Sequence, residues 1–109
     1  MRVYIAGPYR ASTPQGVSIN IVNARYAMFD LIRAGHTPFC PHTMTGEGEI
    51  YASDITDDQW LELGLNWLES CECVLLLLGW QNSAGTLAEK AKAEAMGLPI
   101  YYRLSEIPS

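Results

Sequence analysis

The chain has 109 residues, a hydrophobic fraction of 49%, and a formal net charge of −5 from 7 basic and 12 acidic residues. This length and composition predict one compact domain over residues 1–109 and argue against a disordered chain. The acidic balance argues against broad binding to a nucleic acid polymer or an anionic membrane, but it allows a small phosphorylated ligand.

The cysteines give a first indication of compartment and cofactor. An odd number of them without a signal peptide predicts free thiols and a cytoplasmic location. Neither the cluster of His36, Cys40 and His42 nor the pair Cys71 and Cys73 has the spacing of a known zinc site. With no Walker loop and no GxGxxG fingerprint either, we expect neither a metal nor a bound cofactor.

The first half of the chain predicts two strands and one helix. Residues 2–6 form a β-branched and aromatic run typical of a strand, and residues 7–10 form the loop at its carboxyl end. Residues 11–16 are expected to be loop, followed by a helix from about Asn20 to Ala34 that Gly35 ends. Residues 37–40 predict a brief edge strand, because Pro38 cannot donate to a ladder. The apolar stripe of the helix is expected at Ile21, Ala24, Met28, Leu31 and Ile32.

The second half predicts two more helices and two more strands. Residues 41–56 are expected to be a long loop, of the kind that is usually functional or mobile. A helix follows from about residue 56 or 57 to 70, with Asp57 and Asp58 in its first turn. The continuous apolar run 73–78 is typical of a strand buried on both faces. It is far too short to span a membrane. A helix from residue 85 or 86 to Met96 and a strand over 98–102 complete the pattern.

The helix over residues 57–70 is apolar around much of its circumference, which a surface helix with one buried stripe is not. We therefore predict a subunit contact on it and a homodimer or higher oligomer. The alternative is that its tryptophans simply cover a small sheet. The apolar residues are Trp60, Leu61, Leu63, Leu65, Trp67 and Leu68.

The alternation of strands and helices predicts an α/β three-layer sandwich, flavodoxin-like or Rossmann-like, with a parallel sheet of four to five strands. A strand order of 2-1-3-4 places the switch point between strands one and three, where open sheets bind ligands. Two loops would meet there. One is residues 7–10, and the other is the strand-to-helix turn over residues 83–89.

The turn Ser83-Ala-Gly85-Thr86-Leu-Ala-Glu89 carries the strongest functional signal. A helix start suits anionic groups, Gly85 lets the chain turn or a ligand approach, and Glu89 would lie in the first helical turn as an ionised carboxylate. The alternative for the same residues is a capping box, in which Thr86 and Glu89 cap each other's backbone N–H groups.

Two motifs carry a resemblance to a known family: Val3-Tyr-Ile-Ala-Gly-Pro-Tyr-Arg10 and the Ser83-x-Gly-Thr-x-x-Glu89 turn. Together they resemble the nucleoside 2-deoxyribosyltransferase superfamily, in particular its short members related to the 2′-deoxynucleoside 5′-phosphate N-hydrolases. The resemblance covers nearly the whole chain. It implies cleavage or transfer at the N-glycosidic bond of a (deoxy)nucleoside or nucleotide, and relatives often complete the pocket with a neighbouring subunit.

The resemblance also implies roles for individual residues. Glu89 matches the catalytic glutamate, Tyr4 the tyrosine that assists it, and Ser83 a serine that binds a 5′-phosphate, which favours a nucleotide substrate. One departure is Gly64, which stands where relatives often carry an aspartate that protonates the leaving base; that role would pass to Asp58 or Glu62. The substrate-binding residues are predicted to be Gly7, Pro8, Tyr9 and Arg10 of the closing loop, with His42, Ser83 and Gly85.

Several of these residues have an ordinary structural alternative. Asp58 could be a first-turn helix carboxylate, Arg10 a solvated loop charge, and Tyr4 a core residue. His42 could be structural, and Trp80 could either stack on a base or pack. At the level of function, the alternative to an enzyme is a module of the same fold that binds a nucleotide without turnover.

Overall fold

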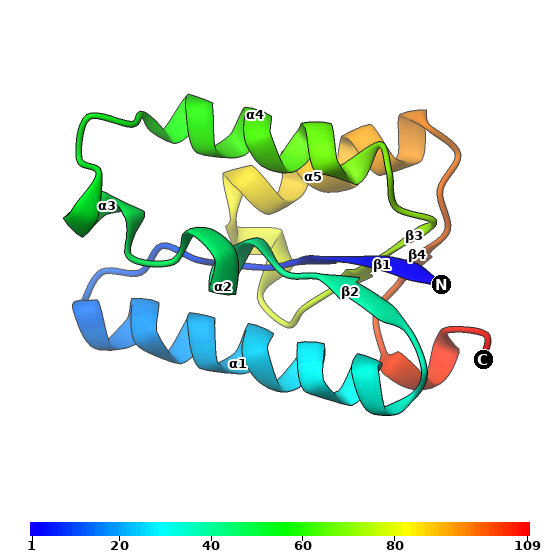
Figure 1. Cartoon of the computed structure of the whole chain (residues 1–109). Coiled ribbons are helices and arrows are strands. Elements are labelled where there is room, and N and C mark those ends of the chain that lie inside the picture. Colours follow the sequence, from blue (N-terminus) through cyan, green and yellow to red (C-terminus); the bar gives the residue numbers. More distant parts are fainter.

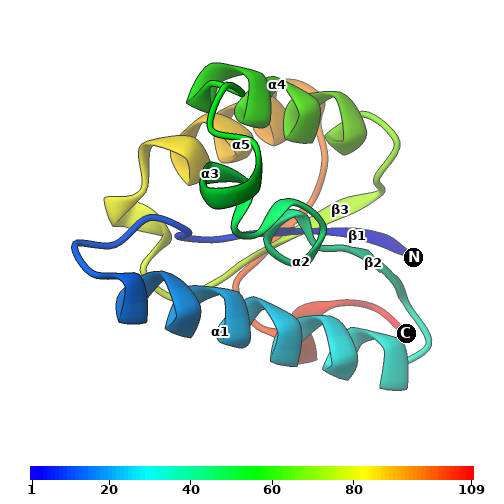
Figure 2. The ribbon, with the colours of Figure 1, turned by 60° about the vertical axis from the view of Figure 1, so that its left-hand side comes forward.

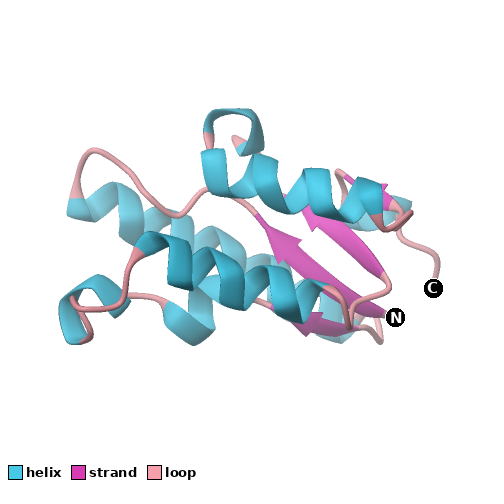
Figure 3. Ribbon diagram, turned by 90° about the horizontal axis from the view of Figure 1, so that it is seen from above, coloured by secondary structure: helices cyan, strands magenta, loops and turns pink.

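The computed structural model describes residues 1–109 and has the predicted α/β sandwich, consistent with a flavodoxin-like or Rossmann-like fold (Figure 1). Its single sheet has four parallel strands in the predicted order β2-β1-β3-β4. The strands lie side by side between the helices in Figure 3. They are β1 (Arg2–Ala6), β2 (Thr37–Phe39), β3 (Cys73–Leu76) and β4 (Ile100–Tyr101).

Helices cover both faces of the sheet. α1 lies on one face together with the last 3₁₀ turn (Leu104–Glu106), and α4 and α5 lie on the other, as Figures 1 and 2 show from two sides. Two short helices, α2 and α3, follow β2. The helices are α1 (Pro14–Arg33), α2 (Pro41–Thr45), α3 (Gly48–Tyr51), α4 (Asp57–Leu68) and α5 (Ala84–Ala95), and a 3₁₀ turn covers Trp80–Asn82.

The core divides into two clusters because successive strand residues point to opposite faces. Val3, Ile5 and Leu75 pack under α1, whereas Tyr4 and Val74 pack under α4 and α5. Every residue of β3 is buried, which confirms the interpretation of its continuous apolar run. The central strands β1 and β3 are therefore the most rigid support that the fold offers to a functional group.

Helix α1 begins six residues earlier than the apolar pattern predicts. Thr13 is its N-cap, with its hydroxyl accepting from the Gly16 N–H at 3.0 Å, and Pro14 occupies the first turn, where a missing N–H costs nothing. The residues taken for loop are thus a helix start. The predicted stripe is wrong at Ile32, which is 53% exposed.

The predicted long loop over residues 41–56 is also wrong, since it contains α2 and α3. The strand predicted over residues 73–78 ends at Leu76, and Leu78 is 97% exposed because the chain has left the sheet. The last strand is likewise shorter than predicted, and α4 ends at Leu68. Element types were therefore predictable in the regular parts, whereas boundaries and short helices were not.

The apolar residues of α4 have partners within the chain. Trp60 lies against α3, where a Cβ on Gly48 would meet its ring at 2.6 Å, and Trp67 stacks on Phe39 with ring centroids 5.2 Å apart. The largest row of exposed apolar side chains lies on α1 instead. It consists of Ile19, Val22, Tyr26, Phe29 and Ile32, which are 40–65% exposed. No helix of the chain has the length and apolarity needed to cross a membrane.

Candidate active site

A cleft of about 1050 Å³ opens at the carboxyl ends of β1 and β3, the predicted switch point. The loop after β1, the segment containing α2 and α3, the start of α4, and the turn into α5 surround it. The predicted residues that line it are Gly7, Pro8, Tyr9, Arg10, His42, Asp58, Ser83, Gly85 and Glu89. The two motifs, 80 residues apart in sequence, are thus brought together as the strand order requires.

Glu89 lines this cleft and pairs with Tyr4, which is buried behind it and does not line the cleft. The Tyr4 hydroxyl donates a short hydrogen bond to Oε2 of Glu89. Oε1 of Glu89 accepts no hydrogen bond from the protein. It is also not one of the buried side-chain atoms without a partner, so it is open to the cleft. Tyr4 is completely buried on the central strand, so its hydroxyl has a fixed position. The pair therefore holds one carboxylate oxygen and leaves the other available.

Burial raises the pKa of the Glu89 carboxyl from its ordinary 4.5 to about 7, and the hydrogen bond from Tyr4 opposes part of that rise. Burial, together with the adjacent Glu89 carboxyl, also raises the pKa of Tyr4, so its phenol keeps its proton. The expectation of a fully ionised carboxylate at neutral pH was therefore wrong, because the sequence does not reveal burial. Glu89 is instead poised to be ionised or protonated near pH 7, a property common among catalytic groups.

Gly64 is the residue of α4 that makes room for this pair. A Cβ at position 64 would lie 2.5 Å from the Tyr4 hydroxyl and 3.6 Å from Oε2 of Glu89. Any side chain there would push the hydroxyl away from the carboxyl. The aspartate that the family resemblance led us to expect at this position is therefore absent, and the Tyr4 hydroxyl fills the space next to it.

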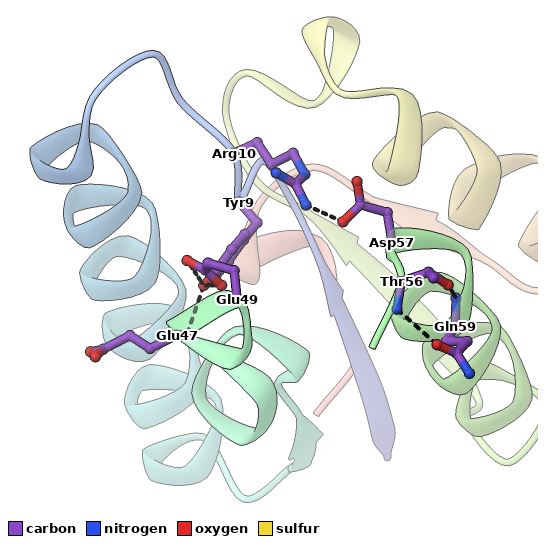
Figure 4. A network of polar contacts seen from close by, with 7 residues as sticks. All are labelled: Tyr9, Arg10, Glu47, Glu49, Thr56, Asp57 and Gln59. Carbon is purple, nitrogen blue, oxygen red and sulfur yellow. Dashed lines mark hydrogen bonds and ion pairs between the residues drawn. The ribbon is translucent and has the colours of Figure 1, made fainter. Parts of the chain in front are cut away.

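The turn into α5 is capped by Ser83 rather than by Thr86. The Ser83 hydroxyl accepts from the Thr86 N–H at 3.2 Å and from the Thr86 hydroxyl at 2.9 Å. Thr86 is buried, and Glu89, the sixth residue of the helix, turns to Tyr4. The capping-box interpretation of Thr86 and Glu89 is therefore wrong, and so is the placement of Glu89 in the first turn. A real capping box with the same spacing joins Thr56 and Gln59 (Figure 4).

His42 lies under the loop that follows β1. Its Nε2 donates to the carbonyl oxygens of Gly7 at 3.1 Å and Pro8 at 3.0 Å, while its Nδ1 is buried without a partner. Burial lowers the pKa of this imidazole, so it is neutral, and the two carbonyls limit the fall. Gly7 itself has no space for a side chain, since a Cβ would meet Leu77 at 2.7 Å. His42 thus holds the loop in place, which is the structural role considered above as the alternative to substrate binding.

The rest of the loop is held from three sides. Asn20 donates to the Tyr9 carbonyl oxygen at 3.0 Å. The Tyr9 hydroxyl accepts from the Glu47 N–H at 2.7 Å and donates to Glu49, which ties the loop to α3 (Figure 4). Across the cleft, Arg10 forms an exposed ion pair with Asp57 at the start of α4. Asn20, Glu49 and Asp57 were not singled out from the sequence, because the segments that carry them were interpreted as loop or as a plain helix start.

Three other residues can now be placed. Asp58 lines the cleft from the first turn of α4 and is exposed. Glu62, the other substitute for the missing acid, lines a separate hollow with Gln59 and Asn66 and does not face the cleft. Trp80 packs against Tyr102, with ring centroids 5.8 Å apart, and does not line the cleft, so the packing interpretation holds for it.

The cleft is acidic. Besides Tyr9 and the neutral His42, its ionisable side chains are the carboxyls of Glu49, Asp57, Asp58 and Glu89 and the single guanidinium of Arg10, which Asp57 already neutralises. No group of three or more histidine, cysteine, aspartate or glutamate side chains is placed to hold a metal ion. The arrangement can therefore present one carboxylate oxygen to an electron-poor centre within a field that attracts positive charge.

The profile of a family described as Domain of unknown function (DUF7768) matches residues 1–103, which is nearly the whole chain. The chain therefore belongs to this family. No curated protein matches it.

Proposed function

We propose that this member of the DUF7768 family cleaves or transfers at the N-glycosidic bond of a nucleoside or nucleotide, with Glu89 as nucleophile. The observation that carries the proposal is Glu89, which lines a cleft at the sheet's switch point and is hydrogen-bonded by the buried Tyr4. Glu89 has a pKa of about 7, one oxygen fixed by a buried phenol and one oxygen open. This is what a positioned nucleophile or acid–base group requires.

In this proposal, Oε1 of Glu89 attacks C1′ of the sugar while the C1′–N bond breaks and its electron pair leaves with the base. The Tyr4 hydroxyl keeps Oε2 in place and stabilises the negative charge before attack. Water then attacks C1′, the C1′–Oε1 bond breaks with its electron pair returning to Glu89, and a proton passes from the water to solvent. A second base in place of water makes the reaction a transfer.

One observation favours a second function, a binding module without turnover. Gly64 stands where relatives often carry the acid for the leaving base, and the space at that position is filled by the Tyr4 hydroxyl. Asp58 is the remaining carboxyl that could serve as acid from α4, and it is exposed in the first turn of the helix. A pure binding module would keep its affinity for the ligand in Glu89→Gln and release no base.

The decisive experiment is chromatography for free base after incubation of the protein with ribonucleosides, deoxynucleosides and their 5′-monophosphates. Glu89→Ala is run alongside, and a second base is added to half of the reactions. Release that disappears in Glu89→Ala supports the glycosidic function, and a new nucleoside that forms only with the second base identifies a transferase. No release from any substrate, with a nucleoside or nucleotide still raising the melting temperature, would leave the binding module.

The proposal includes self-association of the chain as a homodimer or higher oligomer. The side chains best suited to such a contact are Ile19, Val22, Tyr26 and Phe29, which follow a 3-4-3 spacing on the open face of α1. Trp60 is unsuitable as a test of the contact, because it lines the cleft. Tyr26→Glu should lower the mass measured by sedimentation, and an unchanged monomer in both proteins would remove self-association from the proposal.

A further inference from the structure

We propose that the substrate is a nucleoside whose base carries a positive charge at the ring system joined to the sugar, such as an N-alkylated purine or a pyridinium nucleoside. This inference rests on the proposed function and narrows its substrate class. Two independent features of the cleft lead to it, namely its balance of charge and the absence of a placed acid.

The balance of charge comes first. Four carboxyls line the cleft: one from α3, two from the first two residues of α4, and one from α5. The only guanidinium among the lining residues is paired with one of them. A 5′-phosphate entering this space would meet Glu49, Asp58 and Glu89 without a free cation to compensate. Ser83, the residue expected to bind phosphate, uses its hydroxyl oxygen to cap α5. A cationic ligand is attracted by the same field.

The absence of a placed acid is the second feature. A neutral purine or pyrimidine leaves with a negative charge unless a proton reaches it, which is why glycosidic enzymes position a second carboxyl as acid. Here the position facing the pair is Gly64, and the Tyr4 hydroxyl would lie 2.5 Å from any Cβ there. Asp58, the other carboxyl of α4 considered as an acid, lines the cleft but is exposed in the first turn of the helix and is not held against the pair. Tyr4 cannot take over that role, because its pKa is raised and its proton is donated to Glu89.

A cationic base needs no such acid. When Oε1 of Glu89 attacks C1′, the electron pair of the breaking C1′–N bond cancels the positive charge of the ring, and the base departs neutral. No proton is consumed in this step. Water later releases the sugar from Glu89 as described above, and the carboxylate is restored. Glu89 and the cationic ring also attract each other before attack, which favours the ionised carboxyl that the reaction needs.

The test compares substrates that differ by one methyl group and one charge, 7-methylguanosine against guanosine and their 2′-deoxy counterparts. Free base is followed by chromatography, and each rate is corrected for spontaneous release in buffer. We expect a lower KM and a higher kcat/KM for the cationic member of each pair, with the KM of that member rising as salt is added. Release must disappear in Glu89→Ala.

Matched variants separate electrostatic recognition from the greater intrinsic lability of cationic nucleosides. Asp58→Asn removes a cleft carboxylate, and Glu62→Gln removes one on the same helix that does not face the cleft. Asp58→Asn should lower kcat/KM for 7-methylguanosine about tenfold, the effect of losing about 1.4 kcal/mol of charge attraction. Glu62→Gln should leave this kcat/KM unchanged.

The outcomes distinguish this inference from the proposed function. If guanosine is cleaved as efficiently as 7-methylguanosine in a Glu89-dependent reaction, the inference is overturned and the proposed function stands. Equal effects of Asp58→Asn and Glu62→Gln would overturn it in the same way. If neither member of any pair releases base at stoichiometric enzyme, the inference and the proposed function fail together.

Discussion

Replacing Glu89 with glutamine should stabilise the protein at alkaline pH. The substitution keeps the shape of the side chain and leaves an amide oxygen to accept the bond from Tyr4. It removes a charge that the fold disfavours, because burial raises the pKa of Glu89 from 4.5 to about 7. Stabilising by removing a carboxylate is the behaviour expected of a residue kept for chemistry rather than for folding.

The sign and size of this stabilisation follow from proton linkage. A group whose pKa is higher in the folded state favours folding while it is protonated, so its contribution is lost as the pH rises from about 4.5 through about 7. With these two values, the ionised Glu89 costs the fold about 3 kcal/mol at pH 8 but about 1 kcal/mol at pH 5. Because the cleft lets some solvent reach the carboxyl, these figures are upper values.

The assay is chemical or thermal unfolding of the wild type and Glu89→Gln between pH 5 and pH 8. The melting temperature of the variant should exceed that of the wild type by roughly 10 °C at pH 8, and by only a few degrees at pH 5. Glu62→Gln, a change of the same charge at an exposed position, is the control and should leave the melting temperature within a few degrees of the wild type. His42 titrates in all three proteins, so its effect cancels in each difference. Curves of wild type and Glu89→Gln that run parallel over this range would refute the burial of an ionisable Glu89.

Further expectations concern the groups around the pair. Tyr4→Phe removes the bond that lowers the pKa of Glu89, so the acidic limb of the pH–rate profile should move to higher pH, and an unmoved limb would contradict the coupling. Gly64→Ala should abolish most activity and cost about 1–3 kcal/mol of stability through overpacking against Tyr4, measured by urea unfolding with Asn66→Ala as a neutral control. His42→Ala should raise KM by loosening the loop over Gly7 and Pro8, whereas a change in kcat alone would indicate a different role.

Much of the fold could be predicted because the sequence repeats its signals. Apolar strands alternate with helical periodicity, so the sheet order follows from general rules of parallel α/β folds. The first residues of the helices were harder to predict than the order of the strands. Thr13-Pro14 and Thr56-x-x-Gln59 both begin helices, but the first was taken for loop, while Thr86-x-x-Glu89 has the pattern of a capping box and is not one. The same spacing takes a different role when a preceding residue, here Ser83, already caps the helix.

The position of the cleft was predictable from the sequence, but many of its lining residues and its energetics were not. Residues that carry the motifs line one cleft, because strand ends meet at the switch point. The pKa of Glu89, the inward direction of His42 and the contact between Gly64 and Tyr4 depend on packing between segments 25–85 residues apart. No local pattern encodes such contacts, so in the sequence Gly64 was noticed only as a departure from the family that the motifs resemble.

The bond between Tyr4 and Glu89 joins the first strand of the chain to its last long helix. During synthesis, the amino-terminal half emerges with its tyrosine long before the glutamate exists. The Tyr4–Glu89 pair is therefore assembled only when α5 docks on the sheet, and chains that lack α5 or have not docked it do not contain the pair. The proposed activity would then appear only at the end of folding.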